Sequence, residues 1–187
     1  AIAHIDIDET ELGKVLPTAH AIHASADDAL NAILTEIKNA KMTDTSKWQE
    51  SIRQAKRDSM FYYQKSETAI MPQAVIQAVG KVTKGEAVVV TDVGQHQMWV
   101  AQYYPFQNNY QMLTSGGLGT MGYGIPAAIG AKFARRDKEV VLFVGDGGFQ
   151  MTSEELAILN DNDLNIKIIL LNNHSLGMVR QWQTLFY

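Results

Sequence analysis

Two short apolar runs constrain the fold more than any other feature of this sequence. Residues 140–144 (VVLFV) and 166–171 (IKIILL) are rich in β-branched side chains and are bounded by turn formers. This pattern is typical of strands that are buried on both faces of a parallel sheet. The first run leads into Gly-Asp-Gly and the second into Asn-Asn. Because ligands of open α/β sheets bind just beyond the carboxyl ends of the strands, we expect Asp146 and Asn173 at one ligand-binding edge.

Composition narrows the class of protein. Hydrophobic residues make up 46% of the 187 residues, which is enough for a sizeable core. No apolar run is long enough to span a membrane, so we expect no membrane partner. The formal net charge of −4 and the absence of a Lys/Arg run argue against nucleic acid. The sequence has no cysteine, which excludes disulfides and thiolate zinc sites and fits a cytoplasmic protein.

Helical and strand patterns alternate in the second part of the chain. Pro72 suits the first position of a helix, on which Val75, Val79 and Val82 share one face. This alternation predicts an α/β fold, with a parallel sheet and helices on both faces. The further elements expected are strands at 87–91, 140–144 and 166–171, and helices at 95–104, 126–134, 153–160 and 177–187.

The first part of the chain has a different character. Residues 1–8 are predicted as a strand, and residues 27–38 as a helix with an apolar stripe. One strand and one helix cannot bury a sheet face. We therefore interpret residues 1–40 as the tail of a preceding α/β domain, 41–66 as a linker with a short helix at 48–56, and 67–187 as a C-terminally incomplete domain. The chain is expected to be a piece of a longer polypeptide.

A glycine-rich stretch offers one possible motif. Gly117-x-Gly119-x-x-Gly122 matches the dinucleotide-binding pattern, and Asp146 follows the next strand as the ribose-binding acid would. That interpretation requires a strand directly before the glycines, and residues 111–114 contain only two strongly apolar side chains. A nicotinamide site is therefore disfavoured. The glycines could also serve only a tight loop and close helix packing.

The two residues at the sheet edge suggest a metal instead. Asp146 and Asn173 carry hard oxygen ligands, which suit Mg²⁺. Mg²⁺ in proteins usually combines one or two side-chain oxygens with phosphate oxygens and water. The glycines around Asp146 leave backbone N–H groups open to a phosphate, and helices begin close to both residues.

The spacing of these elements is specific. Gly145-Asp146-Gly147 and Asn172-Asn173 are separated by 24 residues, which resembles the signature of thiamine-diphosphate-dependent enzymes. Flanking segments are similar to the catalytic (large) subunit of acetohydroxyacid synthase, also called acetolactate synthase. These segments are DVGQHQMW at 92–99, GTMGYGIPAA at 119–128 and NNHSLGMVRQW at 172–182. The resemblance covers nearly the whole chain and implies the thiamine-diphosphate-binding fold for 67–187, preceded by the end of an FAD-binding domain.

The resemblance implies a role for each group at this edge. Asp146 and Asn173 would hold Mg²⁺ by their side chains, and Ser175 by its backbone oxygen. Gly119 and Met121 would contact the aminopyrimidine ring of thiamine diphosphate, with Met121 supporting the bent shape of the cofactor. The diphosphate would contact the side chains of Gln95 and His96 and the backbone N–H groups of Gly147, Gly148, Gly177 and Met178.

Other implied roles concern the substrate and a second cofactor. Met151 is expected in a wall of the substrate cleft, and Trp182 at the position that favours 2-oxobutyrate as acceptor. Asp6 is a candidate contact to FAD. The family's catalytic glutamate lies in an N-terminal domain that this sequence does not contain. We therefore expect no catalytic residue here and no activity from this chain alone.

The implied reaction is that of acetolactate synthase. Pyruvate is decarboxylated on thiamine diphosphate, and the hydroxyethyl carbanion is transferred to a second pyruvate or to 2-oxobutyrate, in branched-chain amino-acid biosynthesis. The implied assembly is a homodimer or tetramer, with or without a small regulatory subunit. Two alternatives remain open: a related thiamine-diphosphate oxidase or decarboxylase, and a non-catalytic cofactor-binding or interaction module.

Overall fold

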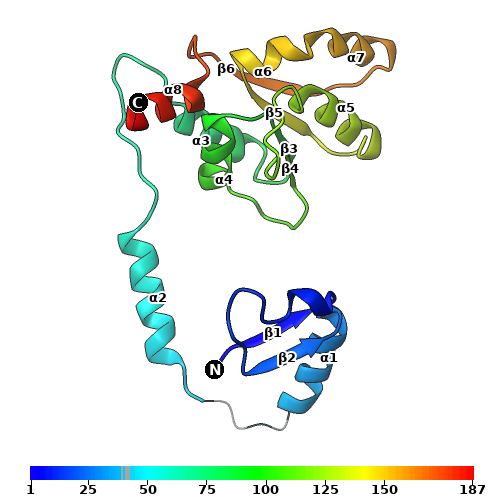
Figure 1. Cartoon of the computed structure of the whole chain (residues 1–187). Helices are drawn as coiled ribbons and strands as arrows, with labels where there is room; N and C mark the ends of the chain where they lie inside the picture. Colours follow the sequence, from blue (N-terminus) through cyan, green and yellow to red (C-terminus); the bar gives the residue numbers. More distant parts are fainter. Residues whose placement is uncertain (39, 41–42) are drawn as a thin grey trace. The chain divides into compact units, whose positions relative to one another are not determined.

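The computed structural model describes residues 1–38, 40 and 43–187 (Figure 1). Residue 39 of the predicted tail and residues 41 and 42 of the predicted linker lie outside this range. The chain forms two compact units, Ala1–Met60 and Phe61–Tyr187.

The first unit is built on two parallel strands, β1 (Ala3–Asp6) and β2 (His20–His23), with Ala3 opposite His20. The 3₁₀ turn η1 (Glu9–Glu11) and helix α1 (Ala26–Ile37) complete it, and α2 (Ser46–Asp58) contains the helix predicted at 48–56. The sequence did not predict β2, because a four-residue His-Ala-Ile-His strand has no apolar run and all its residues are exposed. Ser25 begins α1, since its Oγ accepts a hydrogen bond from the backbone N–H of Asp28 at 3.1 Å.

The second unit is an α/β domain with a parallel four-stranded sheet, so the predicted fold class is confirmed. The strands lie in the order β4–β3–β5–β6. They span Val88–Thr91 (β3), Met112–Thr114 (β4), Val140–Gly145 (β5) and Lys167–Leu171 (β6). The helices are α3 (Pro72–Val82), α4 (Gln95–Tyr103), α5 (Gly124–Ala134), α6 (Asp146–Met151), α7 (Ala157–Asp161) and α8 (Gly177–Phe186), with the 3₁₀ turn η2 at Ser153–Leu156.

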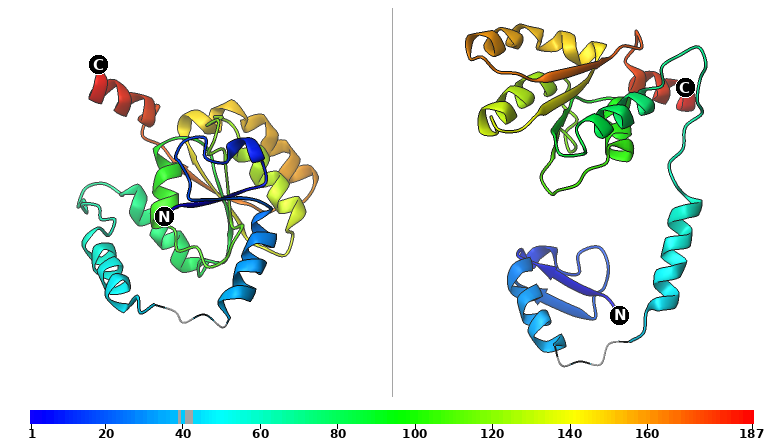
Figure 2. Two further views of the ribbon diagram at one scale, coloured as in Figure 1. Left: turned by 60° about the horizontal axis from the view of Figure 1, so that its bottom comes forward. Right: turned by 180° about the vertical axis from the view of Figure 1, so that it is seen from behind.

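Alternate residues of the two central strands enter two separate hydrophobic clusters. Val140, Leu142 and Val144 of β5 pack with Ile125, Ala128 and Ile129 of α5 on one face. On the other face, Val141 and Phe143 pack with Ile76 of α3 and Val100 of α4. Figure 2 shows helices on both sides of the sheet accordingly. The period-two pattern of a strand buried on both faces is the physical reason for the apolar runs in the sequence.

The order of the strands indicates where a ligand can bind on this sheet. The chain passes from β3 outward to β4 and then crosses back, so that β5 lies on the other side of β3. The chain leaves β3 toward β4 and leaves β5 toward β6, so the two connections run in opposite directions. They leave a crevice between the carboxyl ends of β3 and β5. Ligands of open α/β sheets bind at such a switch point.

Three expectations need correction. Three strands were expected after Pro72, but the short β4 is a fourth among the described residues. On α3, Val82 is 84% exposed, and Ile76 and Gly80 make the close contacts instead. The helix expected at 153–160 is divided into η2 and α7.

Strand β4 precedes the glycine motif, as a dinucleotide site requires. However, β3 lies between β4 and the strand that leads into Asp146. In the dinucleotide-binding unit the strand before the glycines and the strand before the acid are neighbours. The order of strands thus argues against the nicotinamide interpretation.

No helix in the described part of the chain is long and apolar enough to cross a membrane.

Candidate functional site

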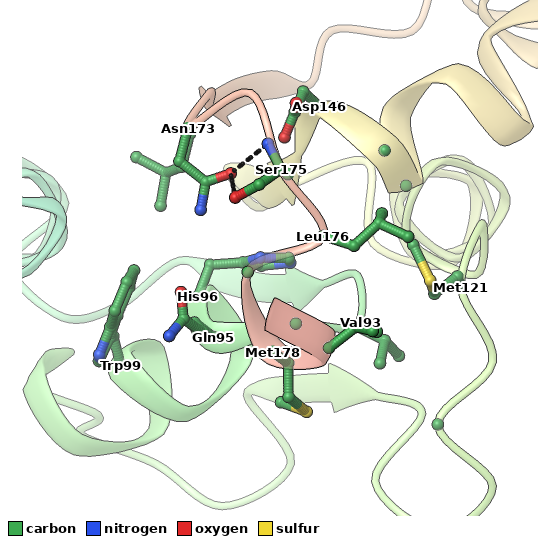
Figure 3. A pocket seen from close by; sticks show the side chains of 18 of the residues that line it. Val93, Gln95, His96, Trp99, Met121, Asp146, Asn173, Ser175, Leu176 and Met178 are labelled. Atoms are coloured by element: carbon green, nitrogen blue, oxygen red, sulfur yellow. Dashed lines mark hydrogen bonds between the residues drawn. The ribbon is translucent and has the colours of Figure 1, made fainter. Parts of the chain in front are cut away.

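A cavity of about 400 Å³ opens at the carboxyl ends of β3 and β5 (Figure 3). Four segments line it: the turn into α4, the loop before α5, the turn into α6, and the loop after β6 with the first turn of α8. Most of the predicted site residues meet here. They are Gln95, His96, Gly119, Met121, Asp146, Gly147, Gly148, Asn173, Ser175, Gly177, Met178 and Trp182.

Three helix N-termini among the described residues face this cavity without a side-chain cap: those of α4, of the six-residue α6 and of α8. Helix α4 begins after Gly94 and α8 after Leu176, and neither N-cap residue makes a side-chain hydrogen bond. The first N–H groups of an α-helix have no partner within the helix. At α4 and α8 these donors line the cavity, where an anionic group can accept from them.

Asp146 and Asn173 lie on one wall of the cavity with Ser175 between them (Figure 3). The Oδ1 atom of Asn173 accepts from the backbone N–H of Ser175 at 3.1 Å and from its Oγ–H at 3.3 Å. This turn fixes the direction of the amide oxygen. Within the described ranges there is no cluster of three His, Cys, Asp or Glu residues that could hold a metal alone. Any metal here would need backbone or ligand oxygens as well.

No lysine or arginine is among the residues that line the cavity. Among the described residues on the wall, Asp146 alone carries a carboxylate. An anionic ligand would therefore face a like charge with no basic side chain to offset it. A divalent cation between the two would remove this repulsion.

His96 is buried, with an exposed fraction of 6%. Burial lowers the pKa of its imidazole, while the charge of Asp92 and a hydrogen bond to the Asp92 backbone act in the opposite direction. Its Nε2 atom has no hydrogen-bond partner among the described residues. The ring is thus a neutral group at pH 7, able to donate or accept a hydrogen bond but contributing no positive charge.

Gln95 and Gln181 tie α4 to α8. The Nε2 of Gln95 donates to the Oε1 of Gln181 at 2.9 Å. Helix α8 has no buried residue, so this bond contributes to holding its N-terminus at the cavity. Trp182 on the same helix lines the cavity, is 59% exposed and packs against Phe186 with ring centroids 4.8 Å apart.

The loop before α5 brings Gly119 and Met121 to the cavity. Gly119 and Gly122 have φ values of +67° and +84°, which favour glycine. The Met121 side chain extends toward α6, because a Cβ atom placed on Gly147 would lie 3.5 Å from the Met121 Cε. The loop therefore brings an apolar side chain close to the first turn of α6.

The sequence analysis did not single out several residues that the structure places here. Val93, Trp99, Leu171, Leu176 and Val179 give the cavity apolar walls. Asp92 lies behind the wall and is fully buried. The sequence feature that could have indicated Asp92 is its position directly after an apolar strand. A carboxylate there either binds a ligand or accepts hydrogen bonds from nearby backbone groups.

Two predicted site residues lie elsewhere. Met151, at the end of α6, does not line the cavity and is 51% exposed. Asp6 belongs to β1 of the first unit, where its Oδ1 accepts from the N–H of Asp8 at 2.8 Å. Their roles stay predictions.

Comparison with known proteins agrees with this geometry. Residues 92–187 match the family described as thiamine pyrophosphate enzyme, C-terminal TPP binding domain. The chain is 54% identical over 186 residues to the acetolactate synthase large subunit of Lactococcus lactis, covering all of this chain and 32% of that protein. It is 42% identical to the acetolactate synthase isozyme 1 large subunit of Escherichia coli and 44% identical to the chloroplastic acetolactate synthase 1 of Zea mays. These matches cover all of this chain and 33% and 30% of the two relatives. The chain thus spans about a third of the length of these relatives, and it belongs to the thiamine pyrophosphate enzymes, whose C-terminal TPP-binding domain it carries.

Proposed function

We propose that this chain is the cofactor-binding part of an acetolactate synthase, in which it holds thiamine diphosphate and Mg²⁺. One observation carries the proposal: the uncapped N-termini of α4 and α8 meet at a cavity that contains Asp146 and Asn173 and has no lysine or arginine among its described lining residues. The names of the relatives support the reaction, in which two 2-oxo acids are joined after one loses CO₂.

The diphosphate would lie at the N-termini of α4 and α8. Backbone N–H groups of Gly177 and Met178 are first-turn donors of α8, and those of Gly147 and Gly148 follow Asp146 in the first turn of α6. Helix N-termini stabilise phosphate groups through these donors and through the helix dipole. The side chains of Gln95 and the neutral His96 would add uncharged hydrogen bonds.

Mg²⁺ would be held at the wall of Asp146, where its charge would offset that of the diphosphate. Asp146, Asn173 and the backbone oxygen of Ser175 are all hard oxygen ligands, and phosphate oxygens with water would complete six-fold coordination. The Asn173 amide oxygen has two lone pairs. We expect it to keep the 3.1 Å bond from the Ser175 N–H and to exchange the longer 3.3 Å bond from the hydroxyl for the metal.

The ring end of the cofactor would lie against the apolar walls. Gly119 offers backbone groups to the aminopyrimidine, and Met121 fills the space between the loop and α6. The bound cofactor supplies an electron sink for decarboxylation and carbon–carbon bond formation. The residues of this chain orient it and exclude water with Val93, Leu176 and Met178.

The remaining predictions extend the proposal to the whole protein. We propose pyruvate as donor and pyruvate or 2-oxobutyrate as acceptor, with Trp182 at the acceptor side. We also propose Asp6 as an FAD contact, a cytoplasmic homodimer or tetramer with or without a regulatory subunit, and a catalytic glutamate outside residues 1–187. The chain alone would then bind the cofactor without turnover.

Calorimetric titration with thiamine diphosphate tests the cofactor site. We expect binding by the full protein that requires Mg²⁺ and is lost in Asp146→Ala. Asp161→Ala, an exposed helical aspartate on α7, is the matched control and should bind normally. Binding that does not depend on Mg²⁺ or on Asp146 would refute the site.

Product analysis of the full protein with pyruvate tests the reaction. Acetolactate supports the proposal, and its partial replacement by 2-aceto-2-hydroxybutyrate when 2-oxobutyrate is added would identify the second acceptor. Acetaldehyde or acetyl phosphate without acetolactate would instead identify a decarboxylase or an oxidase.

A further inference from the structure

Asp92 presents a buried carboxylate directly behind the cavity. Its side chain has no exposed surface, and it is not a lining residue. Its Oδ1 accepts from the backbone N–H of Val93 at 2.8 Å and of Gly122 at 3.2 Å, and its Oδ2 accepts from Gly124 at 2.7 Å. A buried carboxylate is tolerated only when it is well hydrogen-bonded, and these three backbone N–H donors meet that requirement.

The bond from Gly124 connects Asp92 to a helix. Gly124 is the first residue of α5, and the N-cap residue Tyr123 makes no side-chain cap bond. Asp92 therefore serves as the cap of α5 from a strand more than thirty positions earlier. A negative charge is favourable at this end of a helix.

Glycines surround the carboxylate on two sides. A Cβ atom on Gly124 would lie 2.9 Å from the Asp92 Cβ. A Cβ atom on Gly148 would overlap Oδ1 and lie 2.7 Å from Cγ. The carboxylate is thus enclosed between the loop before α5 and the first turn of α6.

We propose that Asp92 is a positioning residue for the cofactor. It joins the three segments that carry Gln95 and His96, Gly119 and Met121, and Gly147 and Gly148, and it fixes the loop that meets the aminopyrimidine. This inference rests on the proposed function, because it assigns the loop a role in holding thiamine diphosphate.

The loop has few other anchors. The tip is open to solvent, with Leu118 at 96% exposure. Thr152 Oγ1 donates to the carbonyl of Gly122 at 3.0 Å, and Ser115 Oγ accepts from the N–H of Thr120 at 2.9 Å. Two glycines with positive φ give the backbone between these bonds additional freedom when it is not held. Loss of the Asp92 bonds should therefore disorder the loop more than the sheet.

The test compares cofactor affinity with stability in the full protein. Asp92→Asn keeps the shape of the side chain but has only one accepting oxygen, so it loses the Gly124 bond or the two others. We expect Kd for thiamine diphosphate in saturating Mg²⁺ to rise about tenfold, equivalent to about 1.4 kcal/mol. The amides of Gly122 and Gly124 should also exchange faster with D₂O in the absence of cofactor.

Gln111→Ala is the matched control. Gln111 is also buried and ties loops at the opposite end of the same sheet, where it donates to the carbonyls of Gly85 and Ala87. We expect this variant to lower the melting temperature at least as much while Kd stays within about twofold. If the role of Asp92 were purely structural, Asp92→Asn and Gln111→Ala would have the same Kd when they lower the melting temperature equally.

Thr152→Val keeps the inference testable if Asp92→Asn does not fold. It removes the other bond to Gly122 and leaves the carboxylate in place, and Kd should rise about threefold. With a wild type that binds the cofactor, normal Kd in folded Asp92→Asn would overturn the role of Asp92 alone. Normal Kd in Thr152→Val would overturn the premise that holding the loop at Gly122 sets the affinity, and the role of Asp92 with it. A wild type that does not bind thiamine diphosphate would overturn the proposed function.

Discussion

Gly147 and Gly148 are neighbours in α6, yet alanine should have opposite effects at the two positions. A Cβ atom on Gly147 would lie 2.6 Å from Cδ2 of Leu176, the end of a flexible side chain that is 49% exposed. Leu176 can move aside at little cost. A Cβ atom on Gly148 would overlap the carboxylate of Asp92, which is fully buried and held by three backbone N–H groups.

The magnitudes follow from these contacts. Alanine in a helix is favoured over glycine by up to about 1 kcal/mol, and this gain applies at both positions. At Gly148 the gain is opposed by overpacking of about 1–3 kcal/mol. A further cost of about 1–3 kcal/mol arises if a buried N–H of Gly122 or Gly124 loses its acceptor. The net expectation is a loss of about 2 kcal/mol for Gly148→Ala, and no loss for Gly147→Ala.

Thermal unfolding of the apo protein, followed by circular dichroism, measures the difference. For a domain of this size a loss of about 2 kcal/mol corresponds to a fall in melting temperature of roughly 8 °C. Gly147→Ala should melt within about 1 °C of the wild type or above it. Equal destabilisation by both variants, or a larger effect at Gly147, would refute the argument that Asp92 is the immovable neighbour.

Two further predictions concern pH and packing. Because burial lowers the pKa of His96 in the folded state from its ordinary value of 6.5, the unfolded chain takes up the proton first, and stability should fall as the pH decreases below 6.5. The melting temperature of His96→Gln should fall less steeply between pH 6.5 and 5, and a slope identical to that of the wild type would exclude His96 as a source of the acid sensitivity. Phe143 of β5 is fully buried in the cluster that β5 forms with α3 and α4, so Phe143→Ala should cost about 3–5 kcal/mol. Phe133→Ala, at a 43% exposed position, should cost less than half as much. Comparable melting temperatures for these two variants would contradict the assignment of the core.

The central strands could be predicted from the sequence because burial on both faces demands a continuous apolar run. β5 begins at the predicted residue and is buried as expected. β6 begins one residue later than predicted, but its expected burial on both faces was wrong, because it lies at the edge of the sheet and none of its residues is fully buried. β2 and β4 could not be predicted, since they have four and three residues and are defined by pairing with a neighbour rather than by their own composition. A short strand at the edge of a sheet has no local pattern that distinguishes it from a loop.

The candidate site shows the same division. Asp146 and Asn173 could be predicted because each follows an apolar strand and the two motifs have a defined spacing. Asp92 also follows an apolar strand, but its partners are backbone N–H groups of Gly122 and Gly124, thirty and thirty-two positions away. A hydrogen bond to a backbone amide does not depend on the side chain of that residue, so the pattern of side chains in the sequence does not predict it. The exposure of Val82 has a similar cause, because helix periodicity does not reveal which of two adjacent stripes meets the neighbouring helix.

The crossing of the chain at β3 and β5 has a consequence for how the domain assembles. Because β4 and α5 lie between β3 and β5 in the sequence, pairing of β5 with β3 closes a long loop of chain. The cavity lies at the end of that pair, and no subset of the strands contains all its walls. A ligand that binds there binds only the completed sheet, and it should stabilise the whole second unit by mass action. Occupancy of the cavity therefore reports complete folding, and a truncated or partly folded form of the domain would have no measurable affinity.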